Sequence, residues 1–449
     1  MRAAIALLLL AACADASPAP DLALVGVDVI DVETASVAHD MTVLIGGDRI
    51  LRVERAGESG FSETTRVLDG AGLYVIPGLW DMHTHALWRP DVADAFLPLF
   101  VAHGITGIRD MGGTMEELHR LRTAEASPDP FRPRVVASGP VLDGPQPIDP
   151  SISLAVETPE EAARAVDELA AAGADFVKVY TMLPREAYFA VLEAAAARGL
   201  PVAGHVPGEV TPIEAAQAGQ VSIEHLRDEI DPPLCEPAEP GDCDPVIGAF
   251  GAAGTYQTPT LVVLRAKSVR GYVEDADAPP DLALLPDVVT REWEALAGMQ
   301  RERPADYFAW RGGVFRDEVR LVGRLHDAGV PLLAGSDTGN PFIVPGASLH
   351  DELAWLVEAG LTPAAALATA TTVPARFLGA ADSLGAVRAG YAADLVLLEA
   401  SPLEHISATR RVRAVVRAGE LLTREDLDAA IEALRANAER PGDEEGGAP

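Results

Sequence analysis

The sequence predicts an α/β fold, a (β/α)8 (TIM) barrel with a small β-sandwich domain built from both termini. Eight strand-like apolar runs alternate with helix-like segments between residues 73 and 337, which is the pattern of a parallel α/β fold. No Gly-x-Gly-x-x-Gly motif follows the first run, which argues against a dinucleotide-binding sheet. β-rich segments bracket this region at both ends, and they predict the shared sheet domain.

The length and the charge of the chain limit its function classes. With 449 residues, of which 48% are hydrophobic and 23% charged, it can hold one large domain, a smaller one and a sizeable core. The formal charge of −33 argues against binding nucleic acid or an anionic membrane surface. The acidic residues are spread along the chain, so a solubilising surface accounts for them.

Residues 1–12 have the features of a signal peptide. Arg2 precedes an apolar run, residues 3–12, that is too short to cross a bilayer as a helix but suits the core of a signal. The run ends in Leu10-Ala-Ala-Cys13, which resembles the bacterial lipobox. We therefore expect export to the periplasm or the outer membrane of a bacterium, with a lipid on Cys13 as the only membrane contact and a tether over residues 13–21. The alternative is an ordinary secretory signal that is cut near Ala16.

The composite sheet domain is expected over residues 22–76 and 382–423. Gly46-Gly47-Asp48 is a hairpin signal between two strand-like runs, and Gly419 marks a turn near the far end. The strand-like runs are residues 22–30, 41–45, 49–53, 394–398 and 411–417. Residues 424–449 are expected to form a last helix, with Thr423 as its cap, and a disordered tail.

Residues 77–381 are expected to form the barrel. Its eight strand-like runs, the first of which begins just before this range, are residues 73–85, 105–111, 134–139, 175–180, 200–206, 221–226, 255–263 and 330–337. Helices are expected over residues 158–172, 185–198 and 211–218. Residues 265–320 are long for one connection, so they are expected to carry extra helices near the barrel mouth.

Two further cysteines, Cys235 and Cys243, lie in a polar, proline-rich loop. In the oxidising compartment that export implies, a disulfide closing this loop would contribute about 2–3 kcal/mol to stability through chain entropy. Two free thiols or a metal-binding loop are the alternatives.

The first candidate site motif is His83-Thr-His85 at the end of the first strand-like run. Side chains alternate between the faces of a strand, so His83 and His85 share a face and stand about 6.6 Å apart along it. Two imidazoles at that spacing can bind one cation. Taken alone the motif is weak, because two strand histidines can share a face by chance.

Four other polar residues lie near the carboxyl ends of later strands, where barrel active sites are built. Lys178 stands between two valines, where an unpaired ammonium would be costly to bury. His205 and His225 end the fifth and sixth strands, and Asp337 ends the eighth. Any one of them could be structural. Together with His83 and His85 they would converge on one mouth, and a bound cation gives such a set a purpose.

The sequence resembles the amidohydrolase superfamily of metal-dependent hydrolases. It is most similar to the branch of imidazolonepropionase-like proteins and of Xaa-Pro and Xaa-Arg dipeptidases, over nearly the whole mature chain. The motifs that carry the resemblance are Pro77-Gly-Leu-Trp-Asp-Met-His-Thr-His85, Gly104-Ile-Thr-Gly-Ile-Arg-Asp110, Val177-Lys-Val-Tyr180, Glu224-His-Leu226, Gly335-Ser-Asp337 and Gly390-Tyr-Ala-Ala-Asp-Leu-Val396. These motifs are specific for the superfamily but not for a substrate.

The resemblance implies a centre of two divalent metal ions, taken to be Zn²⁺. His83, His85 and Asp337 would hold the more buried ion, His205 and His225 the more exposed one, and Lys178, carboxylated by carbon dioxide, would bridge them as a carbamate. A carbamate supplies anionic oxygen ligands, whereas an ammonium has no lone pair to give. Hydroxide shared by the two ions would attack the scissile carbonyl, with Asp337 as general base and then general acid.

The expected function is hydrolysis of an amide bond of a dipeptide or an N-acyl amino acid, a small-molecule substrate. The enzymatic alternative is hydrolysis of a cyclic amide, as by an imidazolonepropionase, or of an ester. The non-enzymatic alternative is a metal- or solute-binding lipoprotein, against which Asp337 argues, since a binder needs no proton shuttle. A homo-oligomer is left open.

Strand alternation also suggests two substrate-binding residues. Arg227 shares a face with His225, and Tyr180 shares one with Lys178, each about 6.6 Å nearer the mouth. A guanidinium and a phenol there could hold a substrate carboxylate. The alternative is that Arg227 pairs with Asp228 or Glu229, or that the strand ends at His225 and the alternation is lost.

Overall fold

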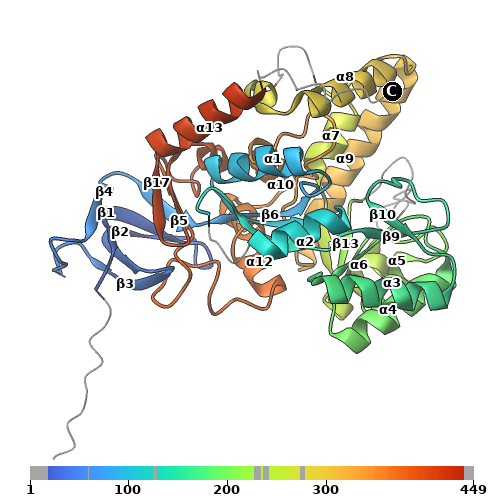
Figure 1. The fold of residues 1–449 in the computed structure, drawn as a ribbon, viewed down its shortest axis with the longest axis horizontal. Coiled ribbons are helices and arrows are strands. Elements are labelled where there is room, and N and C mark those ends of the chain that lie inside the picture. The colour runs from blue at the N-terminus through green and yellow to red at the C-terminus, as the bar shows by residue number, and fades with distance from the viewer. Residues whose placement is uncertain are drawn as a thin grey trace, which may run out of the picture.

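The computed structural model of the chain describes residues 19–58, 60–124, 129–226, 234–235, 242–273 and 279–438. Cys13 and Arg227 lie outside these residues. A β-rich part made of the two ends of the described chain sits beside a larger α/β part (Figure 1). Within the described chain, no helix has both the length and the apolar content that a bilayer crossing requires.

The β-rich part is one eight-stranded sheet of order β17-β16-β15-β5-β1-β2-β3, which branches at β1 because β4 also pairs with it. The chain ends meet where β5 pairs antiparallel with β15, so neither end could complete this sheet alone. Alternate buried residues along its strands, among them Leu24, Val43 and Leu395, pack into one apolar cluster. The strands are β1 Leu22–Asp31, β2 Ser36–Gly46, β3 Arg49–Arg55, β4 Arg66–Asp69, β5 Tyr74–Pro77, β15 Leu395–Leu398, β16 Val412–Arg417 and β17 Glu420–Thr423.

The predicted strand over residues 73–85 is two strands that belong to different sheets. β5 ends at Pro77, and β6, Leu79–Thr84, begins after Gly78 and pairs with the parallel strand β7. A Cβ atom on Gly78 would lie 2.0 Å from Oγ1 of Thr106, so only glycine lets the chain pass from one sheet to the other here. An unbroken apolar run conceals such a change, because both strands are buried.

The α/β part has two parallel sheets. One has the order β6-β7-β8 and the other β10-β9-β11-β12-β13-β14. The short strands β9 and β10 were not predicted, because each has only three residues and neither forms an apolar run of its own. The parallel strands not yet given are β7 Ile105–Asp110, β8 Arg134–Ala137, β9 Val141–Asp143, β10 Ser153–Ala155, β11 Val177–Val179, β12 Val202–Gly204, β13 Ser222–Glu224 and β14 Tyr256–Thr258.

Two predicted strands differ from the structure. Residues 330–337 contain one isolated parallel bridge, at Leu332, in place of a regular strand. They still link the two sheets, because the N–H of Leu333 donates to the carbonyl of Gln257 and that of Met82 to the carbonyl of Ala334. The predicted strand over residues 255–263 ends at Thr258, and helix α7 begins at Leu261. A buried carboxylate explains the change, since Oε2 of Glu352 accepts from the N–H of Val262 at 2.8 Å and so caps α7.

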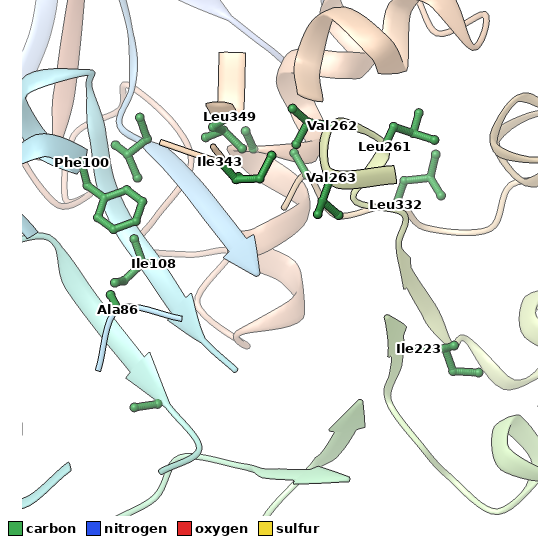
Figure 2. Close-up of a cluster of buried hydrophobic side chains, with 14 of the residues drawn as sticks. Ala86, Phe100, Ile108, Ile223, Leu261, Val262, Val263, Leu332, Ile343 and Leu349 are labelled. Atoms are coloured by element: carbon green, nitrogen blue, oxygen red, sulfur yellow. The ribbon is translucent and has the colours of Figure 1, made fainter. Parts of the chain in front are cut away.

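Helices cover the outer side of the parallel strands. The main apolar cluster joins side chains of both layers, such as Phe100 and Leu349 from helices with Ile108 from a strand (Figure 2). Thr158 and Thr211 cap the helices that begin after them, each accepting from the backbone N–H of a glutamate three residues on. The helices are α1 Pro90–Ala102, α2 Met115–Ala124, α3 Pro159–Ala172, α4 Arg185–Arg198, α5 Pro212–Gln217, α6 Asp244–Ala253, α7 Leu261–Lys267, α8 Asp287–Arg301, α9 Ala305–Asp327, α10 Ala347–Glu358, α11 Pro363–Thr369, α12 Thr372–Phe377 and α13 Arg424–Ala438, with 3-10 turns at Pro280–Leu284 and Ile406–Arg410.

The cysteine pair and the last helix also match their predictions in position. Cys235 and Cys243 form a disulfide with Cα atoms 5.4 Å apart. Thr423 caps α13, because its Oγ1 accepts from the N–H of Asp426 and the carboxylate of Asp426 accepts from the N–H of Thr423.

The buried cap of α7 should make stability depend on pH. Burial raises the pKa of Glu352 from 4.5 to about 8. Between pH 4.5 and about 8, Glu352 keeps its proton in the folded protein but has lost it in the unfolded chain. We therefore expect Glu352 to lower the free energy of unfolding by about 1.4 kcal/mol for each unit by which the pH rises. Urea unfolding of the parent and of Glu352→Gln between pH 5 and 8 measures the slope, which should be smaller in the variant.

The matched control for this prediction is Glu358→Gln, since Glu358 is an exposed glutamate on the same helix. Its slope should equal that of the parent. An equal slope in Glu352→Gln would contradict the prediction.

Candidate metal centre

Four histidines lie together at the carboxyl ends of the parallel strands. His83 is the fifth residue of β6, and His85, His205 and His225 directly follow the ends of β6, β12 and β13. The ring centroids of His83 and His85 are 5.5 Å apart, those of His83 and His225 are 4.7 Å apart, and those of His205 and His225 are 4.9 Å apart. Different strands thus supply side chains to one cluster, as the sequence predicts.

The inner nitrogens of His83 and His85 are held by acceptors. Nδ1 of His83 lies 3.0 Å from Oε2 of Glu224, and Nδ1 of His85 lies 3.2 Å from the carbonyl oxygen of Gly112. A carbonyl and a carboxylate accept hydrogen bonds, so Nδ1 carries the proton in both rings. Nε2 of each ring then keeps the lone pair that a metal ion binds.

The other two histidines are oriented by threonines. Nδ1 of His205 lies 3.0 Å from Oγ1 of Thr181, and Nδ1 of His225 lies 2.6 Å from Oγ1 of Thr260. Because Nδ1 of each ring faces a threonine hydroxyl, Nε2 is the nitrogen that each ring would offer to a metal ion. In all four histidines, therefore, Nδ1 contacts an oxygen of the protein and Nε2 is the nitrogen that would bind a metal ion.

The carboxylate of Asp337 completes the cluster. Its Oδ1 lies 3.4 Å from Nε2 of His83 and 3.5 Å from Nε2 of His85, and its Oδ2 lies 3.9 Å from Nε2 of His225. Nε2 of His83 is buried and has no hydrogen-bond partner among the described residues. Lone pairs that face one another without a proton between them suit a cation, and nitrogen and carboxylate oxygen are the ligands that zinc prefers.

The protonation states of the histidines agree with this fit. Burial, followed by the charge of Lys178, holds the pKa of His83 well below its usual range and lowers the pKa of His85 to about 4. Both imidazoles are therefore neutral near pH 7, which is the form that binds a metal ion.

The backbone is strained at two of the candidate ligands. His225 has φ of +61° and Asp337 has φ of +60°, a region that residues other than glycine rarely adopt. Such strain persists where the surroundings impose it, and it gathers at functional sites. Here it turns each side chain out of its strand and toward the cluster. The strand alternation assumed beyond His225 therefore does not continue.

Lys178 lies in the middle of β11 and is fully buried below the histidines. Its charge acts on both His83 and His85, so it stands close to them. Gly204, just before His205, makes room for it, since a Cβ atom there would lie 3.0 Å from Cδ of Lys178 and 2.1 Å from the carbonyl oxygen of Val179. The structure thus brings together all six residues that the sequence predicts as ligands.

A buried ion pair that was not predicted supports His83. The guanidinium of Arg109, on β7, donates to both carboxylate oxygens of Glu224 at 2.9 Å. Burial alone would raise the pKa of Glu224, but Arg109 and His83 hold it well below its usual range, so the carboxylate stays charged. The same argument that singled out Lys178, a charged residue inside an apolar strand, could have identified Arg109.

The two predicted substrate-binding residues have different outcomes. The ring of Tyr180 lies 4.1 Å from the ring of His205, at the edge of the cluster. Arg227 is not among the described residues, and neither its strand position nor its partner is assigned.

Removing the hydroxyl that orients His225 should weaken metal binding. Thr260→Val keeps the shape of the side chain but leaves Nδ1 of His225 without its partner. We expect the metal affinity to fall by about 10–100-fold, the usual cost of losing a contact that orients a ligand. Competition with a chelator measures it. The control is Thr255→Val, which removes a buried hydroxyl that donates, among the described residues, only to the carbonyl of Gln220. An equal loss in both variants would contradict the prediction.

Comparisons with known proteins agree with this geometry. Residues 74–422 match the amidohydrolase family. An adenine deaminase from Chelativorans sp. is 30% identical over 67% of this chain and 51% of its own length. The imidazolonepropionase of Rubrobacter xylanophilus is 27% identical over 88% of this chain and 94% of its own length. The chain spans about half the length of the adenine deaminases it matches.

Two solved structures are similar over most of the chain. The structure of a bottromycin amidohydrolase has 26% identity and a TM-score of 0.74, and the match covers 93% of this chain and 90% of that one. The structure of a putative prolidase from Bifidobacterium longum has 27% identity and a TM-score of 0.71, and the match covers 93% of this chain and 100% of that one. Because the family match covers most of the chain and includes the strands that carry all six clustered residues, this chain belongs to the amidohydrolase family.

Proposed function

We propose that the protein hydrolyses an amide bond of a dipeptide or an N-acyl amino acid at a centre of two divalent metal ions. The observation that carries the proposal is the convergence of the Nε2 atoms of three histidines, His83, His85 and His225, on the carboxylate of Asp337, with the ring of His205 and the buried Lys178 beside them. Similarity to a putative prolidase supports the choice of a peptide-like substrate.

In this proposal His83, His85 and Asp337 hold one ion and His205 and His225 hold the other. Lys178, as a carbamate formed with carbon dioxide, would supply anionic oxygen ligands to the centre. Zinc in such a site acts as a Lewis acid that polarises a carbonyl and lowers the pKa of water. The full burial of Lys178 supports the carbamate, because an ammonium there would repel the cations.

The other steps belong to side chains of this chain. Asp337 is only 4% exposed, so its carboxylate can take a proton from the attacking water and return it to the leaving nitrogen without exchanging it with bulk water. Tyr180, whose ring lies 4.1 Å from that of His205, would donate a hydrogen bond to the substrate carboxylate. Arg227 is kept as a proposed second donor only on the chemistry of its guanidinium, because β13 ends at Glu224 and strand alternation no longer supports its placement.

We further propose that the two parallel sheets close into the (β/α)8 barrel. The N–H of Asp175, just before β11, donates to Ala137 at the end of β8 at 2.9 Å, and residues 330–338 bridge β14 and β6. These contacts support closure on both sides of the two sheets.

A screen of dipeptides and N-acyl amino acids with zinc-reconstituted protein tests the function. We expect turnover of at least one such substrate and its loss in Asp337→Asn. Turnover confined to imidazolonepropionate or to esters would favour the alternative hydrolase, which the similarity to an imidazolonepropionase supports. Zinc retention without any turnover would leave a metal-binding lipoprotein.

The proposed location is the cell envelope, with a lipid on Cys13. The motif Leu10-Ala-Ala-Cys13 supports it. Mass spectrometry of the mature N-terminus should find an acylated Cys13. A chain that begins beyond Ala14 and carries no acyl group would contradict the anchor and favour ordinary secretion.

A further inference from the structure

A cavity of about 1110 Å³ opens at the amino ends of the parallel strands, the end opposite to the metal centre. Its wall contains Arg134 at the start of β8, Tyr256 at the start of β14, and Phe176 just before β11. The four candidate histidine ligands lie at the carboxyl ends of the neighbouring parallel strands β6, β12 and β13. The cavity is therefore separate from the proposed active site.

One part of the wall is apolar and aromatic. It is formed by Trp80, Phe176, Tyr256, Phe377 and Leu384. The rings of Phe176 and Phe377 lie 5.8 and 5.0 Å from the guanidinium carbon of Arg109, so these rings stand between the cavity and the Arg109–Glu224 pair below the metal centre. This part of the wall suits a hydrocarbon chain or ring.

The other part of the wall holds two arginines that share one carboxylate. Nε of Arg134 lies 2.6 Å from Asp394, and Nη1 of Arg417 lies 3.2 Å from the other oxygen of Asp394. Arg134 makes no further hydrogen bond with the described residues, so both of its terminal nitrogens are free to donate. Burial, and to a lesser degree the charge of Arg134, lower the pKa of Arg417, as expected for two cations held close together.

The remaining charged residues of the wall have partners of their own. Asp175 pairs with Arg122, Asp48 with Arg49, Arg132 with Asp94 and Arg376 with Glu33. Asp129 also acts on Arg417, but it is exposed and accepts from the N–H of Phe131. The Arg134–Arg417–Asp394 group thus carries one excess positive charge, and the exposed Asp129 is a wall carboxylate without an ion pair among the described residues.

We propose that this cavity binds a small monocarboxylate with an apolar body. The carboxylate would accept from the terminal nitrogens of Arg134, and the body would pack against the aromatic wall. A monoanion matches the single excess charge of the Arg134–Arg417–Asp394 group, whereas a phosphate dianion would exceed it and would also be repelled by Asp129. Neither the metal ions nor Asp337 takes part.

Calorimetric titration of the full-length, zinc-loaded protein with decanoate tests the proposal. We expect saturable binding, and we expect decanamide, which lacks the charge, to bind at least about tenfold more weakly. Arg134→Gln should abolish the preference for decanoate and leave decanamide unchanged. Leu384→Trp, which fills the apolar side, should weaken both ligands. Arg413→Gln, an exposed arginine on β16 outside the cavity, is the matched control and should change neither.

Three results would each overturn the proposal. The first is the absence of saturable binding, and the second is equal affinity for decanoate and decanamide in the parent. The third is unchanged decanoate binding in Leu384→Trp, a variant that leaves the ion pairs intact and so decides the matter even if Arg134→Gln does not fold. Loss of binding on removal of zinc would place the ligand in the metal centre instead.

Discussion

Lys178→Ala should lose most of one metal equivalent and reduce turnover by several orders of magnitude. Lys178 is fully buried beside His83 and His85, where its carbamate would bridge the two ions. Without the bridge, the ion held by two histidines alone loses an anionic ligand, and the chemistry that depends on both ions fails. Metal analysis by mass spectrometry and kcat on the substrate found in the screen measure the two effects.

Two further observations sharpen the test of Lys178. Lys178→Glu, which carries a carboxylate from the start, should restore part of the metal content that Lys178→Ala loses. Lys267→Ala, at the end of α7 and away from the cluster, should leave metal content and turnover near the parent values. If Lys178→Ala keeps two metal ions and near-normal activity, the bridging role is wrong.

Arg109→Met should destabilise the fold by about 3–5 kcal/mol, because it leaves the carboxylate of Glu224 buried without its cation. Both side chains have no exposed surface, so water cannot replace the lost partner. Because Glu224 also holds Nδ1 of His83, metal affinity should fall in the same variant. Urea unfolding of the metal-free protein separates the loss of stability from the loss of metal.

The double variant Arg109→Met/Glu224→Met distinguishes an ion pair from a packing effect. Removing both charges should recover much of the stability that Arg109→Met loses, although His83 then lacks its acceptor. Arg320→Met, whose pair with Asp317 is largely exposed, is the control and should change stability little. A double variant no more stable than the single one would assign the effect of Arg109 to packing.

The candidate ligands could be found in the sequence because their positions follow from local rules. Parallel strands present their carboxyl ends at one edge, so a polar residue that ends an apolar run is placed there by its position alone. His205, His225 and Asp337 satisfy this rule, and Lys178 stood out because an ammonium between two valines needs a reason. The helices that begin after Thr158 and Thr211 were also predictable from local rules, because each capping threonine and the glutamate that completes the cap lie within four residues of sequence.

The residues that orient the ligands could not be found in this way. Glu224 lies 141 positions from His83, Thr260 lies 35 from His225, and the carbonyl of Gly112 belongs to the backbone, which no side-chain pattern marks. Their roles arise only when separate strands meet. The substrate side shows the same limit, because Tyr180 was placed by strand alternation but the αL backbone of His225 breaks that alternation before Arg227.

The sequence by itself determined which strands carry ligands and which helices begin where, because periodicity, caps and strand ends are local properties. Tertiary structure alone decided that the run from Leu73 divides at Gly78, where β5 leaves to pair with β15, more than 300 positions away. It also decided that residues after Thr260 form a helix, because a carboxylate from α10 caps them. In both places the local sequence suits more than one backbone conformation. A buried hydrogen-bond partner from a distant segment then selects one of them, because an unpaired backbone group in the core is costly.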